Sequence, residues 1–498
     1  MRLTYMPGLI IPLALTFGAM MPVRAAQPSV HVVKFTALGD APDLVCPVRP
    51  GKPKKPRPPT PTDEPALPLG IPDPQEVQEA LADANAPDVV PPISVPKVST
   101  MAPAWQAVEM NQTFRVAFWG DSHLAAGFFT QELVRRAGVT PDQLHSAFIA
   151  ATLTRPGVRL PVRKACASAD WRHESAHAVP AAAKAPGPAL VNQLSTTADA
   201  SLAWDLRNPQ RTPVHRSLQL LFEQTAAPIR LGIRVDGGVE QQLTLAAPPG
   251  PAVLELQGDT PLSTLQLRLI EGSLRSHGLA LPVPPTARLQ LDLFALPGAT
   301  ARAWQNANLD YLQSWFADAP TYQLVALAYG TNEGNEKPFD AGAYHQMLRQ
   351  SVNQLKHMFP NSACLLIGPG DRGILVPRQR LAKSSSKKSA KQAAGRNAAN
   401  KEPGPRVDLL KYSNIHTEIT RIQQSIGVEL GCQTWSMMSS MGGRASAYSW
   451  VRQRPPLMAN DLIHFTVPGY QHLAQRFADD MGWTPETLWL TSTATARP

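Results

Sequence analysis

The sequence predicts a three-layer α/β/α domain of the flavodoxin-like type, interrupted by an all-β segment with the character of a jelly roll or sandwich. Strand-like runs alternate with helical segments around residue 114 and again after about residue 295, and this alternation predicts a parallel sheet covered by helices on both faces. Between these two parts, short runs of alternating apolar and polar residues are separated by Gly and Pro, which is typical of antiparallel strands joined by turns.

The expected elements follow from the period of the apolar residues. In the α/β part we expect the strands Phe114–Trp119, Tyr322–Tyr329, Ala363–Ile367 and Ile426–Leu430, and the helices Phe128–Arg136, Leu309–Ala317, Ala341–Met358, Tyr412–Ser425 and Val467–Asp480. The β-rich part is expected to contain the strands Leu218–Phe222, Ile229–Val235, Gln242–Leu245, Val253–Leu256, Leu265–Ile270 and Arg288–Phe294.

The N-terminus has the features of a signal peptide, over residues 1–25. Arg2 supplies the positive charge, an apolar run follows from Leu9 to Pro22, and small residues flank a cleavage site near Ala25. The apolar run falls short of the roughly 20 residues that a membrane-spanning helix needs, so cleavage is favoured over an uncleaved anchor. The mature protein is therefore expected in the periplasm, or secreted, without stable membrane insertion.

The remaining boundaries follow from composition. Residues 26–109 are rich in Pro and are expected to form a largely disordered linker, apart from a short helix over Glu76–Ala86. The α/β domain would comprise 110–153 and 295–490, with the β-sandwich inserted at 154–294 and a disordered basic loop at 378–405.

The net charge of +9 is concentrated in one tract. Between Val376 and Arg406 lie nine Lys or Arg residues and one Glu, so this tract carries +8 and the rest of the chain is near neutral. A local tract of this kind does not indicate a basic domain, and nucleic acid is not an expected partner.

The chain has four cysteines: Cys46, Cys166, Cys364 and Cys432. Export permits disulfides, although an even count does not prove that they form. Cys364 lies within an apolar run and Cys432 follows another, so we expect these two to be buried thiols rather than a bridge. No Cys or His cluster has the spacing of a metal site, and no metal is expected.

Residues suited to nucleophilic catalysis follow the ends of the expected strands. Serine needs a neighbouring base, a third group that orients the base, and donors for the oxyanion of the tetrahedral intermediate. Ligands of open α/β sheets bind at the carboxyl ends of the strands. The candidates there are Ser122, Gly298 and Asn332, together with Asp461 and His464 just before the last helix.

Four short motifs resemble the blocks of the SGNH, or GDSL-type, hydrolase family. They are Gly120-Asp121-Ser122-His123, with His where Leu is commoner, Gly298, Gly330-Thr331-Asn332-Glu333, with Glu where Asp is usual, and Asp461-Leu462-Ile463-His464. The resemblance implies that Ser122 is the nucleophile, His464 the base and Asp461 its orienting group. It also implies an oxyanion hole formed by the backbone N–H groups of Ser122 and Gly298 and the side chain of Asn332, with no cofactor.

A closer resemblance is to the bacterial peptidoglycan O-acetylesterases, over about 110–375 and 405–480. These share the Gly-Asp-Ser-His first block, an inserted carbohydrate-binding-like β module and the Gly-Thr-Asn-Glu third block. The resemblance implies an exported serine esterase that removes O-acetyl groups from a cell-envelope carbohydrate, with peptidoglycan as the first choice, through an acyl-enzyme on Ser122. The expected partner is an O-acetylated glycan.

Several alternatives stay open on the sequence. An O-acetyltransferase would use the same triad, and a glycan-binding scaffold would carry it without activity. Trp304 and Trp450 could stack on sugar rings or belong to the core, and we favour the core. His123 could line the site or pack beside the nucleophile turn, and we favour packing.

Overall fold

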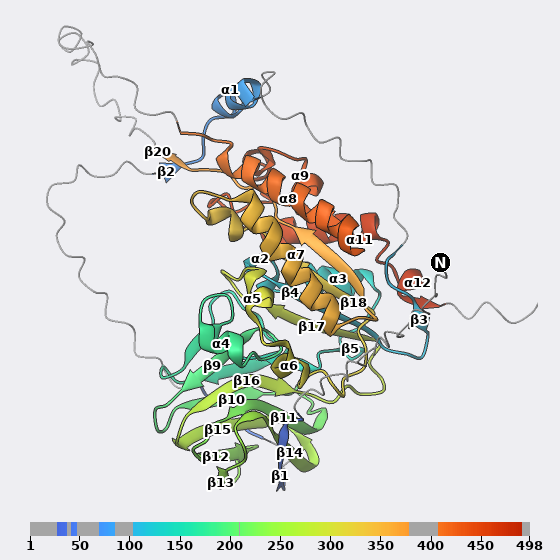
Figure 1. Cartoon of the computed structure of the whole chain (residues 1–498). Helices are drawn as coiled ribbons and strands as arrows, with labels where there is room; N and C mark the ends of the chain where they lie inside the picture. The colour runs from blue at the N-terminus through green and yellow to red at the C-terminus, as the bar shows by residue number, and fades with distance from the viewer. Residues whose placement is uncertain are drawn as a thin grey trace, which may run out of the picture.

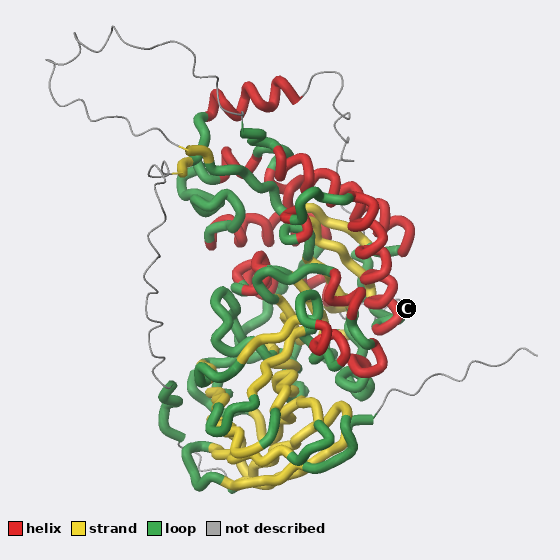
Figure 2. Tube along the Cα trace, turned by 60° about the vertical axis from the view of Figure 1, so that its left-hand side comes forward, coloured by secondary structure: helices red, strands yellow, loops and turns green. Residues whose placement is uncertain are grey.

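The computed structural model describes residues 27–36, 41–46, 69–84, 103–208, 210–377 and 407–490. The predicted signal peptide and basic loop lie outside these residues. Figure 2 shows a strand-rich part at one end of the molecule and most of the helices at the other. None of the helices in the described ranges is long and apolar enough to span a bilayer.

A parallel sheet forms the centre of the α/β part, in the order β21-β19-β18-β4-β17-β5. Its strands are β4 (Phe114–Gly120), β5 (Leu144–His145), β17 (Leu289–Ala295), β18 (Leu324–Ala328), β19 (Ala363–Gly368) and β21 (Gln433–Ser436). When the two-residue edge strand β5 is left aside, the remaining strands follow the flavodoxin-like order 2-1-3-4-5. The strand order therefore agrees with the α/β architecture expected from the sequence.

Helices cover both faces of this sheet (Figure 1). Val116 and Phe118 of β4 belong to the core that contains α3 (Phe128–Arg136) and α11 (Val467–Met481). Ala117 and Trp119 belong to the opposite core, which contains α7 (Ala341–Met358) and α8 (Lys411–Leu430). Because successive side chains of a strand point to opposite faces, this alternation shows three layers.

The strand-rich part consists of two sheets around a shared core. The seven-stranded sheet contains β1 (Ser29–Phe35), β6 (Phe148–Ala150), β8 (Arg172–Ser175), β9 (Val191–Ser195), β11 (His215–Gln224), β14 (Gly250–Leu262) and β16 (Leu274–Ala280). The five-stranded sheet contains β7 (Lys164–Ala167), β10 (Ser201–Asp205), β12 (Ile229–Val235), β13 (Gln241–Leu245) and β15 (Thr264–Glu271). Leu218, Leu254 and Leu267 lie in the buried cluster between them.

Shorter elements complete the described chain. They are β2 (Leu69–Gly70), β3 (Val108–Glu109), β20 (Val376–Pro377), β22 (Trp489–Leu490), α1 (Pro74–Ala84), α2 (Ser122–Ala125), α4 (Pro180–Lys184), α5 (Arg302–Asn306), α6 (Leu309–Gln313), the 3₁₀ turn η1 (Glu333–Asn335), α9 (Met437–Met441), α10 (Ser446–Trp450) and α12 (Pro485–Leu488). The helix predicted at Glu76–Ala86 corresponds to α1.

The strand β17 corrects one sequence assignment. We placed Arg288–Phe294 with the β-rich segment because its residues alternate, but β17 pairs in parallel with β4. Its residues Leu289, Gln290, Leu291 and Asp292 are all buried, since helices and neighbouring elements cover both sides. This strand therefore belongs to the parallel sheet and carries Gly298 to the same edge as Ser122.

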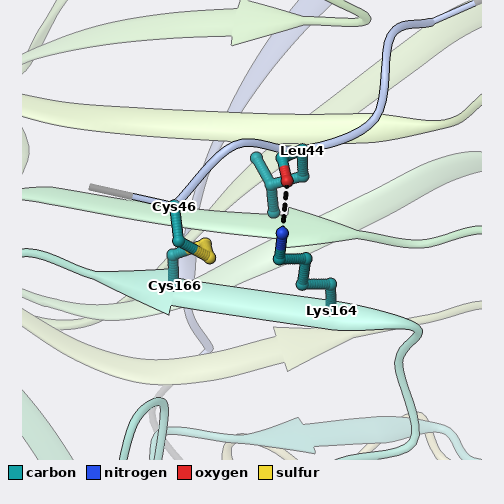
Figure 3. The surroundings of a disulfide bond; sticks show 4 residues. All are labelled: Leu44, Cys46, Lys164 and Cys166. Atoms are coloured by element: carbon teal, nitrogen blue, oxygen red, sulfur yellow. Dashed lines mark hydrogen bonds between the residues drawn. A yellow bond between two sulfur atoms is a disulfide. The ribbon is translucent and has the colours of Figure 1, made fainter. Parts of the chain in front are cut away.

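The segment before the Pro-rich tract is also more ordered than the sequence suggested. Residues 29–35 form β1, which pairs in parallel with β14, so the expectation of a disordered linker is wrong there. A disulfide joins Cys46 to Cys166 of β7, and Lys164 of the same strand donates to the carbonyl of Leu44 at 2.7 Å (Figure 3). The β-branched run in 29–35 was the signal, and the nearby prolines obscured it.

The end of α8 corrects a second assignment. We expected a strand at Ile426–Leu430, but α8 runs through it and ends at Leu430, followed by Gly431, whose φ of +67° suits glycine. Gly427 lets the helix approach the next strand, because a Cβ there would lie 2.4 Å from Thr434 Cγ2. The apolar run is one face of a helix rather than a buried strand.

A disulfide joins Cys364 and Cys432, so the expectation of two free thiols is wrong. Leu365 of β19 pairs with Gln433 of β21, and this register places the two preceding cysteines side by side, with their Cα atoms 4.6 Å apart. That separation is within the range of disulfides. The expected strand at Ile426–Leu430 placed Cys432 after a strand, whereas Cys432 directly precedes β21 and so lies beside Cys364.

Candidate active site

Ser122 lies at the first residue of α2, directly beyond the carboxyl end of β4. The Asp121 carboxylate caps this short helix by accepting the N–H of His123 at 2.9 Å. Burial raises the pKa of Asp121 to about 6, against the effect of this hydrogen bond. The turn thus holds Ser122 at the edge of the sheet, where ligands of such folds bind.

His464 brings its imidazole to the Ser122 side chain. Its Nε2 lies 3.1 Å from Ser122 Oγ, and its Nδ1 lies 2.8 Å from Asp461 Oδ2. A proton on Nδ1 therefore faces the carboxylate, and Nε2 is left as an acceptor for the serine hydroxyl. This is the arrangement of a serine, a base and an orienting acid.

The Asp461 carboxylate is fixed by its own turn. Its Oδ1 accepts the backbone N–H groups of Ile463 at 2.9 Å and His464 at 3.0 Å. Leu462, which lies between Asp461 and Ile463, has a φ of +57° and a buried side chain, which holds the turn against the core. Partial burial opposes ionisation, but the hydrogen bonds from His464 and Ile463 hold the pKa of Asp461 below its ordinary value. Asp461 is therefore suited to face an imidazolium.

Gly298 and Asn332 follow the two strands that flank β4. Ala295 of β17 and Ala328 of β18 both pair with Gly120 at the end of β4, so the three strands end at one edge. The Asn332 Nδ2 donates to the carbonyl of Ala299 at 2.9 Å, which links the loop after β17 to the turn after β18. Asn332 keeps a second N–H on the same nitrogen.

Two backbone donors lie on this edge as well. Within the described chain, neither the Ser122 N–H nor the Gly298 N–H donates to a backbone carbonyl. Gly298 has a φ of +85°, and the space beside its Cα is open. These groups are available for a ligand, which is a requirement for an oxyanion hole.

Glu333 is 2 % exposed, and its carboxylate lies between the loop after β17 and the turn after β18. Its Oε1 accepts the N–H of Ala301 at 2.8 Å, and its Oε2 accepts the N–H of Gly330 at 3.0 Å. Burial raises the pKa of Glu333 to about 7, although these hydrogen bonds oppose the rise. Sequence reasoning gave this residue no role; the signal was a carboxylate next to Asn332.

The His123 side chain packs beside the site and is not part of the hydrogen-bonded chain of Asp461, His464 and Ser122. Its buried ring contacts Phe465, with the ring centroids 5.0 Å apart, and lies 5.7 Å from the His464 ring. Burial lowers the pKa of His123 to about 3, so the ring is neutral. Trp304 and Trp450 are buried in the core, as favoured from the sequence.

Arg372 is a second residue that sequence reasoning left without a role. Its guanidinium donates to Asn335 of η1 and lies 3.9 Å from the centroid of the Tyr412 ring. Burial lowers the pKa of Arg372, although the Asp461 carboxylate opposes the decrease. Arg372 therefore links η1 to Tyr412 of α8.

The site itself is open to solvent. The side chains of His464 and Asp461 are 43 % and 47 % exposed. A separate cavity of about 570 Å³ is lined by Trp105, Gln323 and Ser362, and none of the candidate residues lines it. Gln323 and Ser362 directly precede β18 and β19, so this cavity lies at the end of the sheet opposite Ser122. In the described ranges, no group of three or more His, Cys, Asp or Glu side chains could hold a metal ion.

Comparisons with known proteins bear on the fold. No protein-family profile matches the chain, and no curated protein matches it in sequence. A solved structure of a peptidoglycan O-acetylesterase is similar over 75 % of this chain and 91 % of its own, with a TM-score of 0.53 and 18 % identity.

Two further solved structures are similar at much lower TM-scores, which support no conclusion. A GDSL-like lipase from Parabacteroides merdae shares 14 % identity over 39 % of this chain and 74 % of its own, with a TM-score of 0.25. A family two carbohydrate esterase from Clostridium thermocellum shares 10 % identity over 63 % of this chain and 99 % of its own, with a TM-score of 0.23. The chain therefore adopts the fold of the peptidoglycan O-acetylesterase structure, the fold that its resemblance to SGNH hydrolases implies.

Proposed function

We propose that the chain is an exported serine esterase that removes O-acetyl groups from a cell-envelope carbohydrate, with peptidoglycan as the substrate of first choice. The observation that carries the proposal is the continuous chain of hydrogen bonds from Asp461 through His464 to Ser122, at 2.8 and 3.1 Å. A glycan-binding scaffold has no need of this arrangement.

In the first half of the reaction, Ser122 Oγ attacks the acyl carbonyl carbon while His464 Nε2 takes the hydroxyl proton. The carbonyl oxygen becomes an oxyanion, which would be bound by the N–H groups of Ser122 and Gly298 and by the second N–H of Asn332 Nδ2. Asp461 stabilises the imidazolium. The intermediate then collapses, the sugar hydroxyl leaves with the proton from His464, and Ser122 carries the acetyl group.

In the second half, His464 takes a proton from water, and the resulting hydroxide attacks the acetyl carbonyl. Return of the proton to Ser122 Oγ releases acetate and restores the enzyme. Every step uses groups of this chain and water.

Two observations support a polymeric carbohydrate as the substrate. The side chains of His464 and Asp461 are exposed and Ser122 is half-buried, so an acetyl group that projects from a polymer can reach Ser122. The structurally similar protein is a peptidoglycan O-acetylesterase.

Two disulfides are compatible with an oxidising compartment and hence with the periplasm or the exterior.

The test compares the wild-type chain with Ser122→Ala and a control, Ser449→Ala, which alters an exposed serine of α10. Acetate release is measured on O-acetylated peptidoglycan, O-acetylated xylan and p-nitrophenyl acetate. We expect release from peptidoglycan by the wild type and the control, and none by Ser122→Ala. Activity on xylan alone would defeat the choice of peptidoglycan, and equally negligible activity of wild type and Ser122→Ala on all three would favour a scaffold.

An O-acetyltransferase is the second candidate, because the acyl-enzyme is the same and only the acceptor differs. The open site that admits water also admits a sugar hydroxyl. Acetate release with and without an unacetylated glycan acceptor separates the two: the esterase predicts free acetate in both cases, and a transferase predicts acetylated acceptor.

A further inference from the structure

We propose that Glu333 is a positioning residue of the oxyanion hole, whose carboxylate fastens the loop of Gly298 to the turn that carries Asn332. The inference rests on the proposed esterase function and adds to it a residue that touches neither the substrate nor the triad. It also accounts for a buried carboxylate that the reaction itself does not use.

The geometry joins two loops at two points. The Glu333 carboxylate accepts Ala301 N–H at 2.8 Å from the loop after β17 and Gly330 N–H at 3.0 Å from the turn after β18. The second connection is the bond from Asn332 Nδ2 to the Ala299 carbonyl. Without the carboxylate, the loop after β17 would lose its hydrogen bond to Glu333, and the Ala299 carbonyl that orients Asn332 would be held less firmly.

The two N–H groups have no easy substitute for Glu333. Ala301 and Gly330 are buried, and a buried N–H group that loses its acceptor destabilises the folded state. An ionised carboxylate has acceptor capacity on both oxygens, so it satisfies both donors at once. A neutral amide at the same position would turn an N–H toward one of them.

The surroundings of Glu333 make its charge dependent on pH. The groups that face it are Asp121 after β4, Tyr329 after β18, Tyr344 of α7 and His416 of α8, which contacts the neighbouring Gly334, while Arg302 of α5 pairs with Glu336 nearby. His416 is neutral, because burial lowers its pKa to about 4. None of these groups supplies a cation in contact with Glu333, so the carboxylate depends for its stabilisation on backbone N–H groups, those of Ala301 and Gly330 and its own.

The test measures kcat and KM for Glu333→Gln, Glu333→Asp and the control Glu336→Gln, on p-nitrophenyl acetate and on O-acetylated peptidoglycan. Glu336 lies on the same turn, is exposed and forms a surface ion pair, so its variant controls for the loss of one charge. We expect Glu333→Gln to lower kcat about 10- to 100-fold with little change in KM, because the effect acts on the transition state. The control should stay near wild type.

The order of the two Glu333 variants separates positioning from space filling. Gln has the shape of Glu but lacks the second acceptor, whereas Asp is shorter but keeps the carboxylate. The proposal predicts that Glu333→Asp retains more activity than Glu333→Gln; the reverse order would overturn it. If circular dichroism shows that Glu333→Gln is unfolded, Glu333→Asp decides alone: it must fold and lose kcat without a rise in KM, and wild-type kcat would contradict the proposal.

A double variant and a pH profile complete the test. If Glu333 acts through Asn332, the losses in Asn332→Ala/Glu333→Gln should fall well short of the product of the single losses. The ratio of wild-type kcat to that of Glu333→Gln should rise with pH through about 7, because only the wild type gains the carboxylate and the titration of the triad cancels in the ratio. Multiplicative losses or a flat ratio, with an active wild type, would refute the positioning role and leave the esterase proposal standing.

Discussion

His464 Nε2 lies 3.1 Å from Ser122 Oγ, although 342 residues separate the two in the chain. Ser122 follows β4, and His464 precedes α11, which packs with α3 on one face of the sheet. The intervening strand-rich part leaves this pairing intact, because both its ends return to the parallel sheet.

The first prediction concerns the base and its orienting acid. We expect His464→Ala to lower kcat by about 10³-fold or more, and Asp461→Asn by about 10²- to 10⁴-fold, because the amide places an NH₂ donor where Asp461 Oδ2 accepts the Nδ1 proton. Steady-state kinetics on p-nitrophenyl acetate measure both. The control is His472→Ala, an exposed histidine of α11, which should keep wild-type kcat. An active His464→Ala would exclude this histidine as the base.

The second prediction concerns Asn332. Removal of one oxyanion-hole donor lowers kcat by about 10²- to 10³-fold, and we expect Asn332→Ala to fall in this range with KM little changed. Asn335→Ala alters an exposed amide of the same turn and provides the control. A loss confined to KM would mean that Asn332 binds the ground state instead of the oxyanion.

The third prediction concerns the disulfide between Cys364 and Cys432, which are 68 residues apart in sequence. Closing a loop of this length stabilises the folded state by about 4 kcal/mol, mainly through the entropy of the unfolded chain. Cys364→Ala/Cys432→Ala should therefore lower the free energy of unfolding by about that amount. Urea unfolding with and without reductant measures it.

The matched control is Cys46→Ala/Cys166→Ala, which opens the disulfide of the strand-rich part. Its kcat on p-nitrophenyl acetate should stay at the wild-type value, since this bridge lies outside the α/β part. Identical unfolding curves of wild type and Cys364→Ala/Cys432→Ala, with or without reductant, would show that the Cys364–Cys432 bridge does not form.

The fourth prediction concerns stability and pH. The folded chain holds the pKa of Glu333 at about 7, above its ordinary 4.5, so between these values the folded state keeps a proton that the unfolded state releases. The free energy of unfolding of the wild type should therefore fall relative to Glu333→Gln as pH rises from 4.5 to 7, by up to about 3 kcal/mol. Chemical denaturation at several pH values measures the difference. A difference that stays constant would contradict the raised pKa.

The sequence predicted the parts of the fold that have a strong period. The helices Phe128–Arg136 and Ala341–Met358 have the expected bounds, and the strands at residues 114 and 363 lie where they were placed. Two failures have different causes: a short apolar run does not distinguish a buried strand from one face of a helix, and alternation within a strand does not show which sheet the strand joins. Thus Ile426–Leu430 belongs to a helix, and the alternating Leu289–Ala295 belongs to the parallel sheet.

The candidate site was predictable to different depths. Strand ends identify Ser122 and Asn332 as residues at one edge, because parallel strands end together. The contacts of Glu333 could not be inferred, since they join two loops whose relative position depends on the packing of the whole sheet. The Cys364–Cys432 bridge likewise depends on the register of β19 and β21.

The most direct test of the account is whether Ser122 carries the acetyl group. A reaction of the wild-type chain with O-acetylated peptidoglycan is quenched in acid within milliseconds, and the peptide that contains Ser122 is examined by mass spectrometry. The proposed acyl-enzyme mechanism predicts an acetylated Ser122 that disappears when the substrate is exhausted, with no acetylated peptide and no acetate release in Ser122→Ala. Acetate release by Ser122→Ala at the wild-type rate, or an acetyl group on a different residue, would contradict it.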